Sequence, residues 1–185
     1  MFDNIPALIT SFIAMVLAIL SYFLKKKNLF LILQGSTIVF LSLTCLFQGE
    51  YFALISYVIA IARVISYYAL EQKDKKPAEW LKALFCFMVI LSYVIVNIII
   101  SKKYGWLDIL LIVANILYTY AFAIRNMLLV RYLFLIPTLM SVVYFILSDF
   151  AIFVIISYSF EFVANACAIV LYAIKNKKLK KVKKS

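Results

Sequence analysis

The chain has 185 residues, of which 67% are hydrophobic and 15% are charged, and it carries a formal net charge of +11. So few polar residues cannot cover the surface of a soluble globular domain, and the composition therefore predicts an integral membrane protein of the all-α class. The positive charge lies in short connectors and in a basic tail at 175–185. This placement favours the anionic headgroups of a lipid bilayer as the partner, and not nucleic acid.

Seven apolar runs follow one another along the chain, and each is about long enough to cross a bilayer. A hydrocarbon core about 30 Å thick requires roughly 20 helical residues. The last two runs are separated only by Ser148 and Asp149, but together they would be too long for one span, so we expect a turn there. The segment 1–6 contains no basic stretch and no cleavage site, which predicts a retained first helix and not a signal peptide. The expected spans are 5–24, 28–47, 51–70, 81–101, 107–124, 130–147 and 150–174.

Lys and Arg residues mark one side of the predicted bundle. They follow the first, third and fifth runs, in the segments 25–27, 73–76 and 125–131, and they fill the tail. Short cytoplasmic loops are enriched in Lys and Arg, so we expect the N-terminus outside and the C-terminus inside. The pair Lys102 and Lys103 is the only contrary signal.

The first three runs resemble the last three in sequence. Segment 19–22 (Ile-Leu-Ser-Tyr) is similar to 116–118 (Ile-Leu-Tyr), and 54–57 (Leu-Ile-Ser-Tyr) is similar to 155–158 (Ile-Ile-Ser-Tyr). We therefore expect two parallel three-helix repeats joined by a linker helix, a 3+1+3 layout. Chance similarity among helices rich in Ile, Leu, Ser and Tyr is the alternative. The expected divisions are 1–70 for repeat 1, 71–106 for the connector and linker helix, 107–174 for repeat 2 and 175–185 for the basic cytoplasmic tail.

Several short motifs follow in a set order: a basic connector, a helix ending at a polar turn, a third helix with Arg63 in an Ala-Ile-Ala-Arg segment, the connector 126–131, and Asn165. Over 21–178 this order resembles the YgjV family of bacterial inner-membrane proteins, with a layout similar to PQ-loop, SWEET and PnuC-type transporters. The resemblance implies a multi-pass protein of the bacterial cytoplasmic membrane with a transporter-like fold, and no particular substrate. The chain departs from these patterns because Ala60 stands in place of an Asn, and the Pro-Gln pair of PQ-loop transporters and the Trp-rich pattern of PnuC are missing.

Two charged residues, Arg63 and Glu161, lie near the middle of apolar runs. A charge at that depth costs about 2.5–3.5 kcal/mol for Arg on insertion scales, so it usually marks a function or a forced pair. Both residues lie about 17–18 Å from the predicted outer surface, at 1.5 Å per helical residue. We therefore expect the third and seventh helices to face each other, with Arg63 and Glu161 paired across a central path.

We predict a solute site near the membrane midplane around these two charges. The alternative is that Arg63 and Glu161 form a structural bridge, with the amide side chains bonding between helices. Pro137 lies within the sixth run and is the candidate hinge of a gate, although proline also occurs in membrane helices without that role. The candidate site residues are Arg63, Glu161, Asn165, Asn115, Tyr67 and Gln34, and Asn97 is a further polar residue within a run.

The expected function is a transporter or facilitator of a small polar solute, which works by alternating access of two triple-helix repeats. The alternative is a non-transporting accessory or scaffold protein that co-purifies with a fixed partner. An enzyme is not expected, because the chain has no histidine, no paired acids on one helix and no Ser–Lys dyad in an apolar run. No cofactor or metal is expected either, since Cys45, Cys86 and Cys167 match no metal spacing and are interpreted as packing residues.

Overall fold

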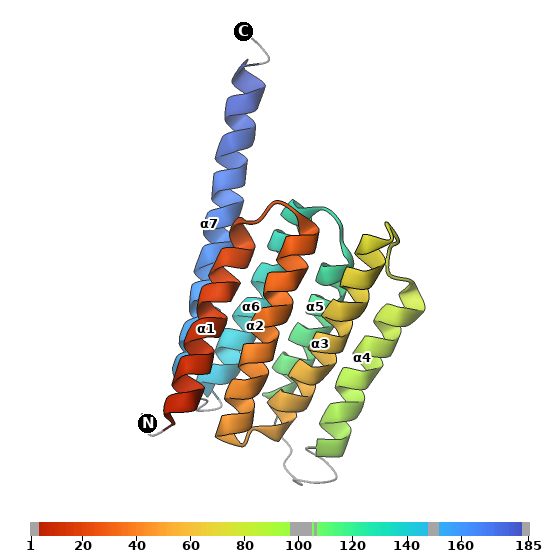
Figure 1. Ribbon diagram of the computed structural model, residues 1–185, viewed down its shortest axis with the longest axis vertical. Helices are drawn as coiled ribbons and strands as arrows, with labels where there is room; N and C mark the ends of the chain where they lie inside the picture. The colour runs from red at the N-terminus through yellow and green to blue at the C-terminus, as the bar shows by residue number, and fades with distance from the viewer. Residues whose placement is uncertain (1–3, 97–104, 106, 148–151, 183–185) are drawn as a thin grey trace.

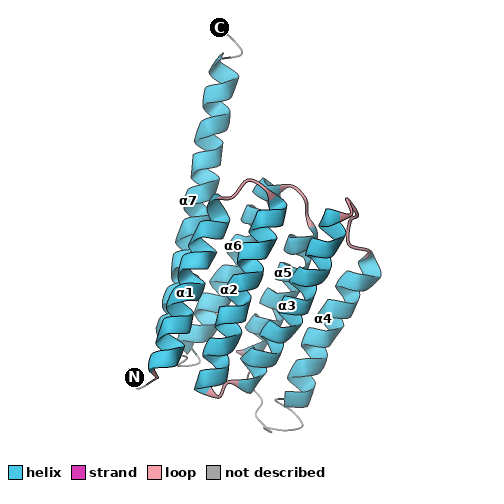
Figure 2. Ribbon diagram, viewed as in Figure 1, coloured by secondary structure: helices cyan, strands magenta, loops and turns pink. Residues whose placement is uncertain are grey.

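The computed structural model describes residues 4–96, 105, 107–147 and 152–182, and the fold over these ranges is entirely helical. The helices lie side by side with their axes along a common direction (Figures 1 and 2). They are α1 (Ile5–Phe23), α2 (Lys27–Gln48), α3 (Tyr51–Gln72), α4 (Glu79–Tyr93), α5 (Asp108–Ala123), α6 (Met127–Leu147) and α7 (Ile152–Val182). The all-helical prediction is confirmed.

Six of these helices are long and apolar enough to cross a membrane, and the fifth is the exception; the fourth is counted to Val96, because helical turns continue past Tyr93. Helix α5 is apolar but has only 16 residues. At 1.5 Å per residue it is about 24 Å long, less than the roughly 30 Å thickness of a hydrocarbon core. The fifth predicted span is therefore a short helix.

The ends of the first two helices follow from local sequence. Asn4 precedes α1, and its side-chain oxygen accepts a hydrogen bond from the N–H of Ala7 at 3.3 Å, as an N-terminal cap should. Helix α2 ends at Gly49, whose φ of 75° places it in the left-handed region. A residue with a Cβ would be strained there, so the predicted break between the second and third runs has a clear cause.

Helix α7 is longer than the predicted span. It continues to Val182, beyond the end of the apolar run at 174 (Figure 1). No glycine or proline follows Pro137 in the sequence, and lysine is a good helix former, so nothing in the tail interrupts the helix. The basic tail, expected only as a segment of charge, is therefore helical in its backbone as far as Val182.

The helices form a closed ring. Helix α1 packs against α2 and α7, α3 packs against α2, α4 and α5, and α6 packs against α5 and α7. The group α1–α2–α3 therefore meets the group α5–α6–α7 along two lines, between α1 and α7 and between α3 and α5. Helix α4 lies on the outside of the ring, beside α3 and α5 (Figure 1).

The connections after α1, α3 and α5 gather at the end of the bundle from which α7 extends (Figure 1). We call it the C-terminal end, and the opposite end, where α1 begins, the N-terminal end. The basic connectors of the sequence thus share one end of the molecule. The compartment that this end faces stays a prediction.

Two long basic side chains tie the two groups together at the C-terminal end. Helices α1 and α5 end in the same way, with an extended residue, Leu24 (ψ 143°) or Ile124 (ψ 136°), as the C-cap. Lys27 of α2 donates a hydrogen bond to the carbonyl oxygen of Ile124. Arg131 of α6 donates one to the carbonyl oxygen of Leu24 at 2.8 Å. Each group therefore satisfies a carbonyl at the helix end of the other.

Candidate functional site

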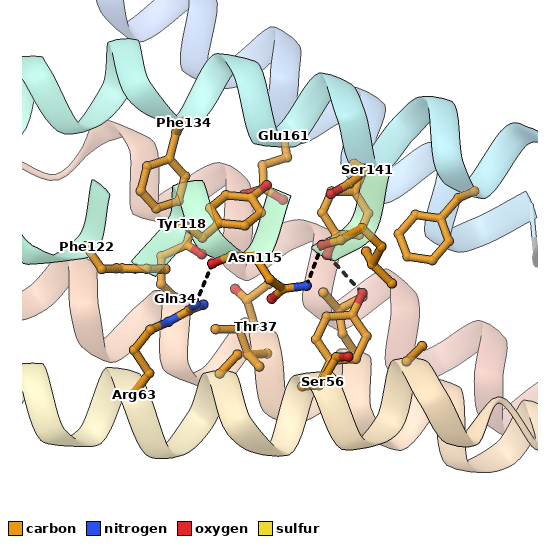
Figure 3. Close-up of a pocket in the computed structure, with 18 residues that line it drawn as sticks. Gln34, Thr37, Ser56, Arg63, Asn115, Tyr118, Phe122, Phe134, Ser141 and Glu161 are labelled. Carbon is orange, nitrogen blue, oxygen red and sulfur yellow. Dashed lines mark hydrogen bonds between the residues drawn. The ribbon is translucent and has the colours of Figure 1, made fainter. Parts of the chain in front are cut away.

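A cavity lies inside the ring, between the two groups of helices. Its wall is formed by side chains of α2, α3, α5, α6 and α7 (Figure 3). The space open to the centre of a water molecule is about 40 Å³, which is room for roughly three waters. The neutral and charged polar side chains of the wall, apart from tyrosines, are Gln34, Thr37, Ser56, Arg63, Asn115, Ser141 and Glu161.

Arg63 enters the cavity from α3 and reaches towards α5 (Figure 3). Its side chain is 2% exposed. One terminal nitrogen, Nη1, donates to the carbonyl oxygen of Asn115 at 3.0 Å and to Oγ1 of Thr119 at 2.7 Å. The guanidinium carbon also lies 5.3 Å from the centre of the Phe122 ring. All of these partners are neutral, and Nε has no hydrogen-bond partner among the described residues.

Glu161 enters the same cavity from α7 and is 6% exposed. Its Oε1 accepts a hydrogen bond from the hydroxyl of Tyr22 on α1. Gln34 of α2 lies next to the carboxyl group and donates to the hydroxyl of Ser21 at 2.8 Å. The carboxyl group is thus surrounded by neutral donors from the first two helices.

The prediction that Arg63 and Glu161 pair directly with each other is wrong. No ion pair within the described ranges joins them. Each side chain instead bonds to the neighbouring helix of the other group. Arg63 of α3 bonds to α5, and Glu161 of α7 bonds to α1. The two charges share one cavity without neutralising each other.

Two tyrosines connect the groups on the N-terminal side of the charges. The hydroxyl groups of Tyr57 on α3 and Tyr158 on α7 are 2.9 Å apart and share a hydrogen bond. These are the final residues of the two Ser-Tyr segments that resemble each other in sequence. Tyr57 precedes Arg63 by six residues, so it lies about 9 Å nearer the N-terminal end. Beside it, Oγ of Ser56 is buried and has no partner within the described part of the chain.

Aromatic rings fill the bundle on the C-terminal side of the charges. Tyr22, Phe30, Phe122 and Phe134 come from α1, α2, α5 and α6, so the cluster includes both groups of helices. The ring centres of Phe122 and Phe134 are 4.9 Å apart, and those of Phe30 and Phe134 are 5.7 Å apart. The edge-to-face arrangement of these pairs is a favourable one for aromatic rings. Phe122 and Phe134 of this cluster line the cavity on this side.

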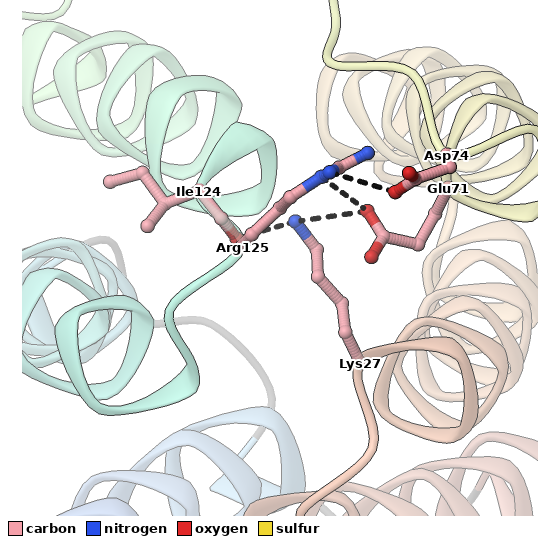
Figure 4. A network of polar contacts seen from close by, with 5 residues as sticks. All are labelled: Lys27, Glu71, Asp74, Ile124 and Arg125. Atoms are coloured by element: carbon pink, nitrogen blue, oxygen red, sulfur yellow. Dashed lines mark hydrogen bonds and ion pairs between the residues drawn. The ribbon is translucent and has the colours of Figure 1, made fainter.

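A network of charges lies beyond the aromatic cluster, since Arg125 follows Phe122 by three residues (Figure 4). Arg125 lies in the connector between α5 and α6. Its Nη1 is 2.9 Å from Oδ1 of Asp74, and its Nε is 3.6 Å from Oε2 of Glu71. Lys27 approaches the same Glu71 carboxylate at 4.0 Å and donates to Ile124. The network therefore joins the end of α3 and the start of α2 to the connector of the other group.

Four of the six predicted site residues line the cavity: Arg63, Glu161, Gln34 and Asn115. Tyr67 does not, because its ring packs edge-to-face on Phe85 of α4 at 5.9 Å. Asn165 also lies elsewhere: its side chain donates to the carbonyl oxygen of Arg131 at 2.7 Å, which joins α7 to α6.

Two other predictions concern Pro137, the candidate hinge, and Asn97, a further polar residue within an apolar run. Pro137 is buried within the continuous helix α6, and its role as a hinge stays a prediction. Asn97 lies outside the described residues.

Two tyrosines of the site, Tyr22 and Tyr118, are not among the residues predicted from the sequence. Tyr22 binds Glu161, and Tyr118 lines the cavity and shares a hydrogen bond with Thr138 at 2.9 Å. A signal was present, because each tyrosine ends one of the Ile-Leu segments shared by the first and fifth runs. Within the described ranges, no group of three or more His, Cys, Asp or Glu side chains could hold a metal ion.

Comparison with known proteins identifies a family. A family described as "Imp-YgjV: Bacterial inner membrane protein" matches residues 6–175, which is most of the chain. This match confirms the resemblance that the sequence motifs indicated. No curated protein and no solved structure matches the chain.

Proposed function

We propose that this chain, which belongs to the Imp-YgjV family of bacterial inner membrane proteins, moves a small polar solute through the cavity between its two groups of helices. One observation carries the proposal: two opposite charges, Arg63 and Glu161, line a single cavity at mid-bundle and are not paired with each other. Charged groups within a membrane are costly, and they characteristically mark the path of a solute or ion. A bundle that served only as a scaffold would be more stable with apolar residues at both positions.

The contacts between the groups support two parallel repeats, α1–α3 and α5–α7, with α4 as the linker. Arg63, on the third helix of one group, binds α5, the first helix of the other. Glu161, on the third helix of its group, binds α1. The hydrogen bonds from Lys27 to Ile124 and from Arg131 to Leu24 are reciprocal in the same way. A rocking motion of one repeat against the other would therefore break and re-form matched contacts.

Each end of the cavity is closed by contacts that such a motion could open. On the N-terminal side the closing contact is the hydroxyl pair of Tyr57 and Tyr158. On the C-terminal side it is the aromatic cluster together with the charges around Glu71. A single neutral hydrogen bond contributes about 1 kcal/mol, and a partly exposed ion pair contributes about 0.2–1 kcal/mol. The polar part of each contact is therefore weak enough to break and re-form during such a motion.

A cysteine placed in the cavity tests whether water-soluble molecules reach it. Cys45, Cys86 and Cys167 are first replaced by alanine, and Ser56→Cys is then introduced into the cavity wall. A charged, membrane-impermeant thiol reagent is added to oriented vesicles from each side in turn. We expect Ser56→Cys to react from at least one side, because a transport cycle must open the cavity.

The matched control is Ile65→Cys on the same helix, whose native side chain is 62% exposed on the outside of the bundle. In a bilayer this position faces lipid and should react slowly from both sides. If Ser56→Cys reacts no faster than Ile65→Cys from either side, the cavity is closed to water. That result would refute the proposal and favour the accessory or scaffold role.

Uptake measurements test transport itself. Vesicles with and without the protein are incubated with a bacterial metabolite extract, and the contents are compared by untargeted mass spectrometry. A solute enriched by the wild type should be lost with Arg63→Ala and retained with Ile65→Ala, at equal amounts of inserted protein. Equal uptake by Arg63→Ala would remove Arg63 from the site.

A further inference from the structure

The two charges of the cavity lack counter-ions, and this narrows the class of solute. Arg63 has only neutral partners, namely Asn115, Thr119 and the ring of Phe122. The carboxylate of Glu161 is bonded by the hydroxyl of Tyr22. Neither residue takes part in an ion pair with any described residue. The buried cavity therefore offers one guanidinium and one carboxyl group, and neither of them forms an ion pair with a described residue.

The hydrogen-bonding capacity of Arg63 is also incomplete. Of its donors, Nη1 serves both Asn115 and Thr119, while Nε is buried and has no partner within the described ranges. A guanidinium group presents its donors in a planar fork that matches a carboxylate or phosphate. A side chain that is 2% exposed and still has an unused donor is therefore suited to an anionic group of a ligand.

Each simpler class of solute would leave a charge uncompensated. An anion would neutralise Arg63 but would be repelled by Glu161, and a cation would do the opposite. A neutral polar solute would leave both charges buried without a counter-ion, which is costly in a low-dielectric site. Only a solute that carries one negative and one positive group provides a counter-ion for both Arg63 and Glu161.

We propose that the solute is a small zwitterion, with its anionic group on Arg63 and its cationic group on Glu161. This inference rests on the proposed function of the cavity. The cavity has room for about three waters, so the smallest zwitterions fit with least rearrangement. Neutral groups of the same wall, among them Gln34 beside Glu161 and the unpartnered Ser56 on the N-terminal side of the charges, would bond the remaining polar atoms of the solute.

Four probes of nearly equal size and shape separate these classes: glycine is a zwitterion, glycolate an anion, glycinamide a cation and glycolamide neutral. Their binding to the purified full-length protein is measured by the shift of its thermal unfolding midpoint as a function of probe concentration. Longer ω-amino acids and their hydroxy-acid and amide counterparts extend the series, because the solute has to span the two walls. We expect the zwitterion of the best length to bind about tenfold or more tightly than its matched anion and cation, since each of these loses one charge-assisted contact.

Two substitutions should change the selectivity in opposite directions. With Glu161→Gln, which keeps the shape and an acceptor for Tyr22, the anion should become the preferred probe. With Arg63→Gln, the cation should become preferred. If these residues had a purely structural role, the substitutions would weaken the binding of all four probes equally or of none. The direction of the change in selectivity is therefore the diagnostic result. If Arg63→Gln does not fold, the probe series on the wild type and on Glu161→Gln still decides.

Two outcomes would overturn the inference. One is a wild type that binds the neutral or singly charged probe as tightly as the zwitterion, and the other is a wild type that binds none of the probes. The test of the proposed function is separate, because it measures only the access of a thiol reagent to Ser56→Cys. A reactive cysteine with no preference for zwitterions would leave the cavity a transport path and exclude this class of solute.

Discussion

Replacement of Arg63 by methionine distinguishes a binding residue from a structural bridge. The change removes two hydrogen bonds from a charged donor, each contributing about 1.5–3 kcal/mol, and a contact with the Phe122 ring that contributes about 1–2 kcal/mol. It also removes a buried charge without a counter-ion, whose desolvation costs several kcal/mol. These contributions are opposite in sign and similar in size.

The partners of Arg63 do not become unsatisfied when it is replaced. Thr119 already donates its hydroxyl to the carbonyl oxygen of Asn115 at 2.8 Å, and this bond remains in the variant. Methionine is apolar, flexible and long enough to fill most of the space. We therefore expect Arg63→Met to be within about 1 kcal/mol of the wild type in stability, or more stable, while its binding of solute is lost.

The assay is the midpoint of thermal unfolding of the purified protein, followed as loss of the monodisperse peak on size exclusion. For a chain of this length, 1 kcal/mol corresponds to roughly 2–4 °C. The control is Ile65→Met on the lipid-facing side of the same helix. A residue of a structural bridge would lose about 3–5 kcal/mol, or roughly 6–20 °C. A drop of about 6 °C or more for Arg63→Met would refute our reasoning and restore the structural interpretation.

Three further predictions concern the closures and the wall of the cavity. A double-mutant cycle of Tyr57→Phe and Tyr158→Phe should give a coupling energy of about 1 kcal/mol in unfolding experiments, and a coupling near zero would show that the hydroxyl pair is not formed. Arg125→Ala should lower the free energy of unfolding by at most about 2 kcal/mol, since it removes two partly exposed ion pairs. It should also accelerate the labelling of Ser56→Cys from the C-terminal end. An unchanged labelling rate would mean that the network does not close the cavity. Tyr67→Phe should leave probe selectivity unchanged, because Tyr67 lies against α4 and outside the cavity, and a change in selectivity measured with the four probes would contradict this placement.

The helices could be predicted from the sequence because each depends on local properties. Length, apolarity and the break at Gly49 are readable along the chain, and the basic connectors indicate which helix ends lie together. Even the central position of Arg63 and Glu161 follows from counting residues along a helix. The extension of α7 does not follow from apolarity, because the apolar run ends at 174, whereas lysine does not interrupt a helix.

The contacts of the site could not be predicted in the same way. Helical spacing gives the face on which a residue lies, but not the neighbouring helix that this face meets. Arg63 meets α5 and Glu161 meets α1 because of the closed ring, which depends on packing between segments far apart in the sequence. Tyr22 and Tyr118 were missed because a tyrosine that packs and a tyrosine that presents its hydroxyl to a partner have the same helical spacing.

The unbroken length of α7 makes this helix a lever. Glu161 lies nine residues from its start at Ile152, whereas Val182 lies 21 residues further on, about 31 Å away along the axis. A tilt of about 10° around Glu161 would therefore move the far end of the helix by about 5 Å. A solute that moved Glu161, as proposed, would therefore produce a larger displacement at the protruding end of α7. A spectroscopic label at the end of α7 could therefore report on the occupancy of a cavity that it never touches.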